Sequence, residues 1–276
     1  SLRLAKYVAL VFPKFLLNTP EFSTTRAELA QKSVDAILDF GEKGFPGILV
    51  ETIAIFINNL AAPANTKVFS LTHRLHLTQP QAYIFDPELP YWIIYRNQLF
   101  DSVCRKLDFD VFEVFRDRQL TNKLLSSSGE LRVLKSRNLS DDGKEILDIP
   151  GYDSYISYAA AKPLSVFQYL DAPNVYLTPN MTYKPRMMKK PPHCVVNGSL
   201  AILIPKKDFT LSEKQLSYFS TEEYRTFYQI ARNFQTRSLN VDSCSVFFYG
   251  LLRDEPKSSR SDSTEPIQLS FDDCVK

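Results

Sequence analysis

The stretch YVALVFPKFLLNTPEFSTTRAELAQKSVDAILDFGEKGFPGILVETIAIFI, residues 7–57, decides the fold of the first part of the chain. Its apolar, β-branched runs at 7–12, 33–40 and 50–58 predict three buried strands. A Ser/Thr-rich start and an amphipathic pattern predict a short helix within 19–32. This order is typical of the edge of an α/β sheet. One crossover helix cannot close a core, so we expect further sequence before residue 1.

A glycine-flanked loop joins the second and third predicted strands. Gly44 and Gly47 enclose Phe45 and Pro46, and glycine lets the backbone turn where other residues cannot. The residues alone leave two interpretations open. The ring of Phe45 either packs back onto the core or is offered to a ligand.

The composition is that of a globular protein. The chain has 276 residues, of which 44% are hydrophobic and 23% charged, enough for one large domain or two ordinary ones. No apolar run reaches the roughly 18 residues that span a bilayer, so we expect no membrane protein. The four cysteines are widely separated, which argues against zinc and disulfides and indicates a reducing cytoplasm. His73 and His76 are three residues apart but lack a neighbouring carboxylate or cysteine at ligand spacing. We expect a solvated or internally satisfied pair, not a metal site.

The positive charge is unevenly distributed. The net charge is only +2, yet residues 174–207 contain six Lys or Arg and no acid. A second basic stretch lies between Arg116 and Arg137. Local basic patches on a nearly neutral protein suit a polyanion-binding face, with a solvated surface as the alternative.

Beyond residue 67 the pattern changes. Residues 60–67 look like the end of the first unit, and 89–109 predict an amphipathic helix. Short β-like runs then follow at 111–118, 131–138, 174–179 and 193–205, before a predicted helix at 211–234 and a predicted strand at 243–252. We predict an α/β domain at 1–75, an α+β, β-rich domain at 76–253, and a flexible acidic tail at 254–276.

The first 58 residues resemble the late motifs of adenine-N6 DNA methyltransferases of TaqI-like and type IIS-like restriction–modification systems. The features that carry the resemblance are Phe12-Pro13, Arg26, Asp39 to Gly41, Phe45-Pro46 and Glu51-Thr52. The rest of the chain is similar to the target recognition domains of the same enzymes. The segments concerned are FEVFRDRQLTNK, LRVLKSRNLSDDG, NVYLTPNMTYKPRMMKKPPHCVVNGSLAILIPK and YRTFYQIARNFQTRSLN. The resemblance implies the carboxy-terminal edge of a doubly wound methyltransferase sheet, followed by the recognition domain.

The resemblance also implies a function. It points to the carboxy-terminal part of a site-specific adenine methyltransferase that uses S-adenosyl-L-methionine, with Phe45 and Pro46 holding the flipped adenine. The family's Asn-Pro-Pro-Tyr and Phe-x-Gly-x-Gly motifs do not occur here. We therefore expect no catalytic residue, no metal and no bound cofactor, and no methyl transfer by this chain alone. The alternatives are a non-catalytic DNA-specificity subunit of a restriction–modification system, or another restriction-system or RNA-binding protein with the same recognition fold.

Double-stranded DNA is the expected partner, since Lys and Arg neutralise phosphates while Arg, Asn and Gln read base edges. The candidate DNA-binding residues are Arg116, Arg118, Gln119, Lys123, Lys135, Arg137, Asn138, Asn180, Tyr183, Lys184, Arg186, Lys189 and Lys190. Further expected partners are the missing amino-terminal catalytic part and a cognate restriction endonuclease, in a bacterial cytoplasm and with no membrane.

Overall fold

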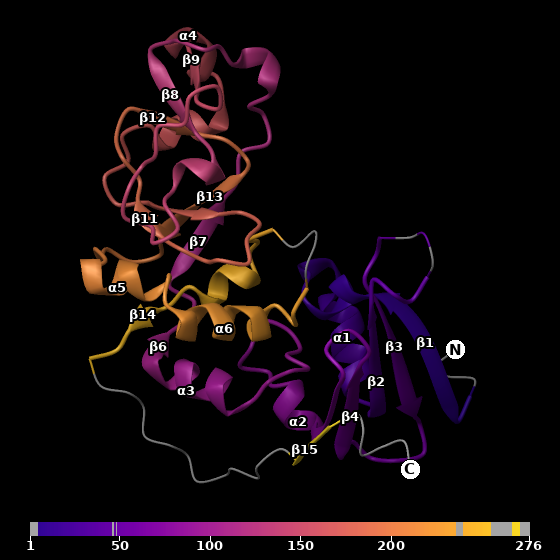
Figure 1. The fold of residues 1–276 in the computed structure, drawn as a ribbon. Helices are drawn as coiled ribbons and strands as arrows, with labels where there is room; N and C mark the ends of the chain where they lie inside the picture. The colour runs from indigo at the N-terminus through magenta and orange to yellow at the C-terminus, as the bar shows by residue number, and fades with distance from the viewer. Residues whose placement is uncertain (1–4, 46, 48, 236–239, 255–266, 271–276) are drawn as a thin grey trace. The chain divides into compact units, whose positions relative to one another are not determined.

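The computed structural model describes residues 5–45, 47, 49–235, 240–254 and 267–270. They form two compact units, each of which is a mixture of strands and short helices (Figure 1). Unit one comprises the described residues up to Arg105, the segment 229–235 and the strand β15. Unit two comprises 106–228 and 240–254. Unit one therefore extends well past residue 75, where the sequence pattern placed the domain boundary.

Unit one is built on a six-stranded sheet in the order β1-β3-β2-β4-β5-β15. Figure 1 shows β1, β3 and β2 side by side. The strands are β1 (Tyr7–Pro13), β2 (Ser33–Gly41), β3 (Thr52–Asn58), β4 (Asn65–Ser70), β5 (Leu75–Pro80) and β15 (Ile267–Ser270). The helical segments are 3₁₀ turns at Lys14–Leu17 and Pro20–Phe22, with α1 (Ser23–Ala30), α2 (Gln81–Ile84) and α3 (Gln98–Lys106).

Four strands of this sheet, β1, β2, β4 and β15, share one direction. β3 lies antiparallel between β1 and β2, so β1 and β2 run parallel to each other, and β2 also pairs in parallel with β4. The three strands and the helix predicted within residues 7–58 are confirmed. The β4–β5 hairpin was not predicted: the sequence pattern ended the unit at the residues where β4 begins.

Along the strands of this sheet, buried and exposed side chains alternate, as expected when only one face of a sheet is covered. Ile53, Ile55 and Ile57 of β3 are buried on one face together with Val34 and Ile37 of β2. Fully burying each aliphatic side chain contributes about 1.5–3 kcal/mol. The opposite face keeps large apolar groups in solvent: Tyr7 is 67%, Val11 56% and Phe56 40% exposed.

Two sequence predictions for unit one are corrected. The helix predicted at 89–109 begins only at Gln98, where the Asn97 side chain accepts a hydrogen bond from the Phe100 amide at 3.0 Å. The five residues Tyr91–Tyr95 are all buried, whereas an amphipathic helix exposes one face. The predicted tail lies mostly outside the described residues, but Ile267–Ser270 pairs with β5 and is not part of a free tail.

A buried ion pair joins the ends of the strands. The Lys14 Nζ lies 2.6 Å from the Asp39 carboxylate and 3.6 Å from that of Glu51, and the Lys14 and Asp39 side chains are 2% and 0% exposed. Asp39 also accepts hydrogen bonds from the Tyr95 hydroxyl at 2.5 Å and from the Gly41 amide at 2.9 Å. The Lys14 amide donates to the Glu51 carbonyl at 2.7 Å. Lys14 therefore links β1, the end of β2 and the start of β3.

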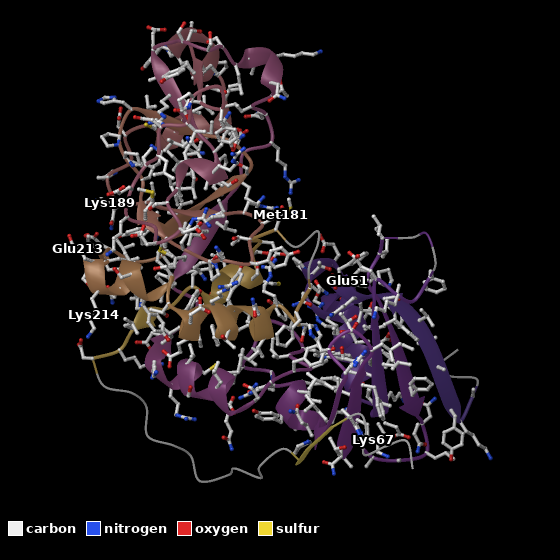
Figure 2. All side chains as sticks on the ribbon, in the orientation of Figure 1. Glu51, Lys67, Met181, Lys189, Glu213 and Lys214 are labelled. Atoms are coloured by element: carbon white, nitrogen blue, oxygen red, sulfur yellow. The ribbon has the colours of Figure 1, made fainter. Side chains whose placement is uncertain are left out.

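Lys14→Met is expected to lower the free energy of unfolding of unit one by about 3–5 kcal/mol, because it leaves the Asp39 charge buried without its cation. Trp92 is the single tryptophan of the chain and is buried in unit one. Its fluorescence during urea unfolding therefore reports on this unit. Lys67→Met is the control, since Lys67 is exposed and lies at the other end of the sheet from Glu51 (Figure 2). Equal stability of the two variants would contradict a central role for the pair.

Unit two contains three small sheets among its described residues. Their orders are β11-β10-β13-β7, β12-β8-β9 and β14-β6. The strands are β6 (Leu107–Asp108), β7 (Phe112–Phe115), β8 (Leu131–Leu134), β9 (Ser154–Ile156), β10 (Tyr176–Pro179), β11 (Met188–Lys189), β12 (Cys194–Val196), β13 (Leu200–Pro205) and β14 (Leu251–Leu252). The helices are α4 (Tyr158–Ala161), α5 (Glu213–Tyr218) and α6 (Glu222–Ala231), which runs into unit one, with 3₁₀ turns at Asn122–Leu124, Ser136–Asn138, Ser165–Tyr169 and Ser245–Phe248. One apolar core joins the first two sheets through residues such as Val133, Leu177 and Ile202.

The predicted β-rich character of this unit is confirmed at 111–118, 131–138, 174–179 and 193–205, each of which contains a strand. The helix predicted at 211–234 is two helices, α5 and α6. Ser212 and Gln215 form a reciprocal capping box at the start of α5. Of the strand predicted at 243–252, only Leu251–Leu252 is a strand, and Ser245–Phe248 is a 3₁₀ turn. The Phe248 ring packs with those of Phe227 and Phe109.

Candidate nucleic-acid interface

A pocket of about 270 Å³ opens in unit one beside the carboxyl ends of the parallel strands. Lys14 directly follows β1, Gly41 ends β2, and Thr72 and His73 follow β4. Ligands of open α/β sheets bind at this edge of the strands. The lining residues are Lys14, Gly41, Glu42, Lys43, Glu51, Thr72, His73 and Phe234.

The Lys14–Asp39 pair fixes the floor of the pocket. Tyr95 donates its hydroxyl hydrogen to Asp39, and burial followed by the Asp39 charge raises the pKa of Tyr95 well above its usual value. Tyr95 therefore stays a neutral donor. Lys14, which lines the pocket, is therefore held in place by a buried ion pair.

The loop that carries Phe45 leaves from the rim of this pocket. Gly41 has φ +55°, and a Cβ added there would stand 2.2 Å from the Thr72 Oγ1; one added at Gly44 would stand 2.2 Å from the Thr52 Oγ1. Both positions therefore require glycine. Phe45 is 46% exposed, so its ring is accessible to solvent and does not pack into the core. Pro46, predicted with it as a base contact, lies outside the described residues.

An aromatic wall forms another side of the pocket. The His73 and Phe234 rings are 4.7 Å apart, and Tyr95 lies edge-on to both, at 6.0 Å from His73 and 5.3 Å from Phe234. Phe234 has φ +51°. The preceding Asn233 is buried and binds the Ile94 amide and the Trp92 carbonyl. This wall could not be predicted from the sequence, since Phe234 lies 161 positions beyond His73 in the chain.

His73 is exposed and His76 is partly buried, which agrees with the predicted solvated or internally satisfied pair. His76 stacks on Phe69, with ring centroids 4.3 Å apart, whereas His73 faces the pocket. Partial burial, and then the nearby Lys14 charge, lower the pKa of His73 from 6.5; Asp39 and Glu51 act in the opposite direction. The imidazole is therefore neutral at pH 7.

The free energy of unfolding is expected to fall as the pH drops through the interval between 6.5 and the lower folded-state pKa of His73. In that interval the unfolded chain binds the proton that the folded protein does not, so this contribution to stability is complete only above pH 6.5. His73→Asn is expected to flatten this part of the profile. Urea unfolding of both proteins between about pH 5 and 8 measures the difference. Identical profiles would show that His73 titrates normally.

In unit two, the thirteen candidate DNA-binding residues divide by exposure. Those with exposed side chains are Arg118, Gln119, Lys123, Arg137, Tyr183, Lys184 and Lys189, and those partly buried are Arg116 and Lys135. The buried ones are Asn138, Asn180, Arg186 and Lys190.

The four buried side chains make hydrogen bonds within the protein. Arg186 donates to the carbonyls of Ser136 and Leu139, at 3.1 and 3.3 Å. Lys190 donates to the carbonyls of Leu170 and Pro191, at 2.7 and 3.0 Å. Burial lowers the pKa of both cations. We therefore withdraw Arg186 and Lys190 from the proposed interface.

The two buried asparagines are also occupied within the protein. Asn138 donates to the Leu147 carbonyl and the Asp153 carboxylate, at 3.0 and 2.6 Å. Asn180 donates to the Gly198 carbonyl at 2.9 Å and accepts from the Val241 amide at 3.0 Å. Neither amide can read a base in this arrangement, so we withdraw both.

The remaining cations include two pairs of neighbours. Arg118 lies close enough to Arg116 to contribute to the lowering of the pKa of Arg116, behind the larger effect of burial. Lys135 and Arg137 both lie over the ring of Tyr152, at 4.0 and 4.7 Å.

Two other candidates have partners or a separate position. Lys184 pairs with Asp141 at 3.1 Å. Figure 2 shows Lys189 and Met181 on opposite sides of this unit.

Met181 is an exposed side chain that the sequence reasoning missed. It is 63% exposed and stands two residues before Tyr183, which is 53% exposed. The loop that carries them is braced by Asn180 at one end and Arg186 at the other. The only signal in the sequence was a methionine inside a polar, proline-flanked run.

Lys189→Met and Lys190→Met are expected to act differently although the residues are neighbours. Lys189→Met should weaken binding to all duplexes alike, with a salt slope smaller by about 0.9 per lost phosphate contact, and leave stability unchanged. Lys190→Met leaves buried carbonyls without a donor and should lower the free energy of unfolding by about 1–3 kcal/mol. Fluorescence anisotropy with duplex DNA at several salt concentrations, and thermal unfolding, measure the two effects. The reverse assignment would contradict the burial pattern.

No protein-family model and no curated protein sequence matches the chain. Among solved structures it is similar to the type IIG restriction endonuclease BpuSI, with 10% identity, a TM-score of 0.32 and 91% of this chain covered. The chain spans 40% of the length of that protein. Within the described residues, no three His, Cys, Asp or Glu side chains are grouped as metal ligands. No helix in the same part of the chain is long and apolar enough to cross a membrane.

Proposed function

We propose that this chain is the DNA-recognising, carboxy-terminal part of a site-specific adenine-N6 DNA methyltransferase of a restriction–modification system. The observation that carries the proposal is the presentation of Phe45 on a loop that requires glycines, at the rim of a pocket beside the carboxyl ends of parallel strands. A base inside a duplex must leave the stack before its amino group can react, and proteins hold such a base against aromatic rings. Phe45 offers such a ring.

The cofactor would be held elsewhere. The pocket of about 270 Å³ is smaller than the ~300–1,000 Å³ of most small-molecule sites, and two carboxylates line it. Because of this small volume we propose no S-adenosyl-L-methionine site here, and we derive no step through that group. The contribution of this chain is to bind DNA and to hold the base while a separate catalytic segment supplies the methyl group.

The unpaired outer edge of β1 supports the proposal that an additional segment packs against this sheet. β1 ends the strand order, and no strand of the described residues pairs with its outer side. Tyr7 and Val11 of β1, and Phe56 of β3, expose apolar side chains on one face. An exposed apolar face beside an unpaired strand edge is typical of a surface that further strands or helices cover. We propose that the catalytic segment adds there.

Unit two supplies the proposed contacts to duplex DNA. Arg118, Lys123 and Arg137 have exposed side chains and can neutralise phosphates. Met181 and Tyr183 project from a braced loop and can contact bases in a groove. The buried basic residues keep these elements in place.

Phe45→Ala is expected to reduce methylation about 5- to 150-fold when the catalytic segment is supplied, because one base stack contributes roughly 1–3 kcal/mol. Phe45→Trp should keep much of the activity, since any flat ring can stack. Initial rates of methyl transfer to a cognate duplex measure both. Melting temperatures of the variants should match that of the parent protein, because the ring is already half exposed.

Two results would contradict this role for Phe45. Full activity of Phe45→Ala combined with a lower melting temperature would make the ring structural. DNA binding without any methylation, with all expected segments present, would favour the non-catalytic specificity subunit.

A further inference from the structure

The loop from Asn180 to Arg186 in unit two holds two large apolar side chains in solvent. Met181 is 63% exposed and Tyr183 is 53% exposed. Both are more exposed than any other large apolar side chain among the described residues of unit two. Single apolar side chains are common on protein surfaces, whereas neighbouring ones mark an interaction surface.

Hydrogen bonds brace this loop at both ends and inside. At its first end the Asn180 side chain donates to the Gly198 carbonyl at 2.9 Å. Inside the loop the Thr182 hydroxyl binds both the amide and the carbonyl of Lys184, at 2.9 Å each. At the second end Arg186 donates to two backbone carbonyls of another segment. A braced loop loses little conformational entropy when it binds, so its apolar tip is preorganised for a partner.

Two arginines flank the base of the loop. Gly198, which binds Asn180, is in close contact with the Asp117 carbonyl, because a Cβ added at Gly198 would stand 2.6 Å from that oxygen. Arg116 and Arg118 are the chain neighbours of Asp117, and Arg118 is exposed. Burial, and then the nearby charge of Arg118, lower the pKa of Arg116. An anion such as a DNA phosphate would stabilise both of these cations.

The occupant that fits this surface has an apolar interior and an anionic exterior. Duplex DNA has both, since its stacked bases lie between two rows of phosphates. Proteins that kink DNA insert apolar side chains between neighbouring base pairs, and an aromatic ring can stack on a base. Residues 174–207 contain no acid that would repel the phosphates. Lys184 is matched by Asp141 at 3.1 Å, so the phosphate contacts fall to the two arginines.

We propose that Met181 and Tyr183 form a wedge that enters between two neighbouring base pairs of duplex DNA, while Arg116 and Arg118 bind the phosphates beside the opened step. The inference rests on the proposed function and deepens it, because it assigns distortion of the duplex to unit two. A wedge has to separate stacked bases, which costs free energy. A duplex in which one base is already missing avoids part of this cost.

The test therefore compares two forms of one short duplex, intact and with a single central abasic site. Fluorescence anisotropy measures the binding of each to the whole chain, without cofactor and without methyl transfer. The parent protein is expected to bind the abasic duplex about tenfold more tightly, because part of the unstacking cost is removed.

Variants of the loop locate the wedge. Met181→Ala and Tyr183→Ala should each reduce the preference for the abasic duplex, and Met181→Leu should keep it, because an apolar side chain of similar volume can enter the same step. Arg118→Gln should weaken binding to both duplexes by the same factor, because a phosphate contact does not depend on stacking.

Tyr158→Ala is the matched control and should bind as the parent does. Tyr158 is 45% exposed and lies in α4, at the other end of unit two from Met181 (Figures 1 and 2). The replaced loop side chains are exposed, so melting temperatures should match that of the parent protein and show that each variant is folded.

Equal affinity of the parent protein for the two duplexes, or an unchanged preference in both alanine variants of the loop, would overturn the wedge. Binding without preference overturns the wedge alone, whereas a chain that binds neither duplex overturns the proposed function as well. A changed oligomeric state of Met181→Ala in sedimentation, with unaltered DNA binding, would assign the loop to a second copy of the chain and overturn the inference.

Discussion

The buried pair of Lys14 and Asp39 is the interaction on which unit one depends. An ion pair taken out of water stabilises a fold only when its geometry is good and the remaining polar atoms are satisfied. Here Asp39 binds Lys14, the Tyr95 hydroxyl and the Gly41 amide. The same side chains set the end of β2, the direction of the Phe45 loop and the floor of the pocket. Stability and the candidate site are thus one network.

The sequence could predict elements whose pattern is local. Strands β2 and β3 follow from apolar periodicity, and the glycines around Phe45 correctly indicated a loop. Helix α1 forms where it was predicted, but the predicted Ser/Thr cap was wrong, because the helix starts after Phe22 without a side-chain cap. The β4–β5 hairpin was missed because its alternation is weak and its buried polar residues, Thr66 and Gln79, do not look like core. The residues before α3 look helical because apolar side chains recur there, yet tertiary packing buries all of Tyr91–Tyr95.

The residues of the candidate site also divide into those that could be predicted from local sequence and those that could not. Exposure of Phe45 agrees with a loop that the glycine spacing already indicated. The His73–Phe234 wall could not be foreseen, because it joins segments that only the folded chain brings together. For the basic residues, the sequence predicted more candidates than the structure leaves exposed. Charge density alone cannot separate Lys189, which faces solvent, from Lys190, whose ammonium group binds buried carbonyls. Only the partners of a side chain decide whether a cation is available to a ligand.

The loop between Asn180 and Arg186 has a consequence for evolution. Its two ends are fastened by buried hydrogen bonds to the rest of unit two, whereas Met181 and Tyr183 project outward. Replacement of an exposed side chain away from such anchors usually changes stability by less than about 0.5 kcal/mol. Mutation can therefore sample new residues at these positions while the fold is conserved. Such a loop lets a lineage vary two exposed side chains without loss of a stable scaffold.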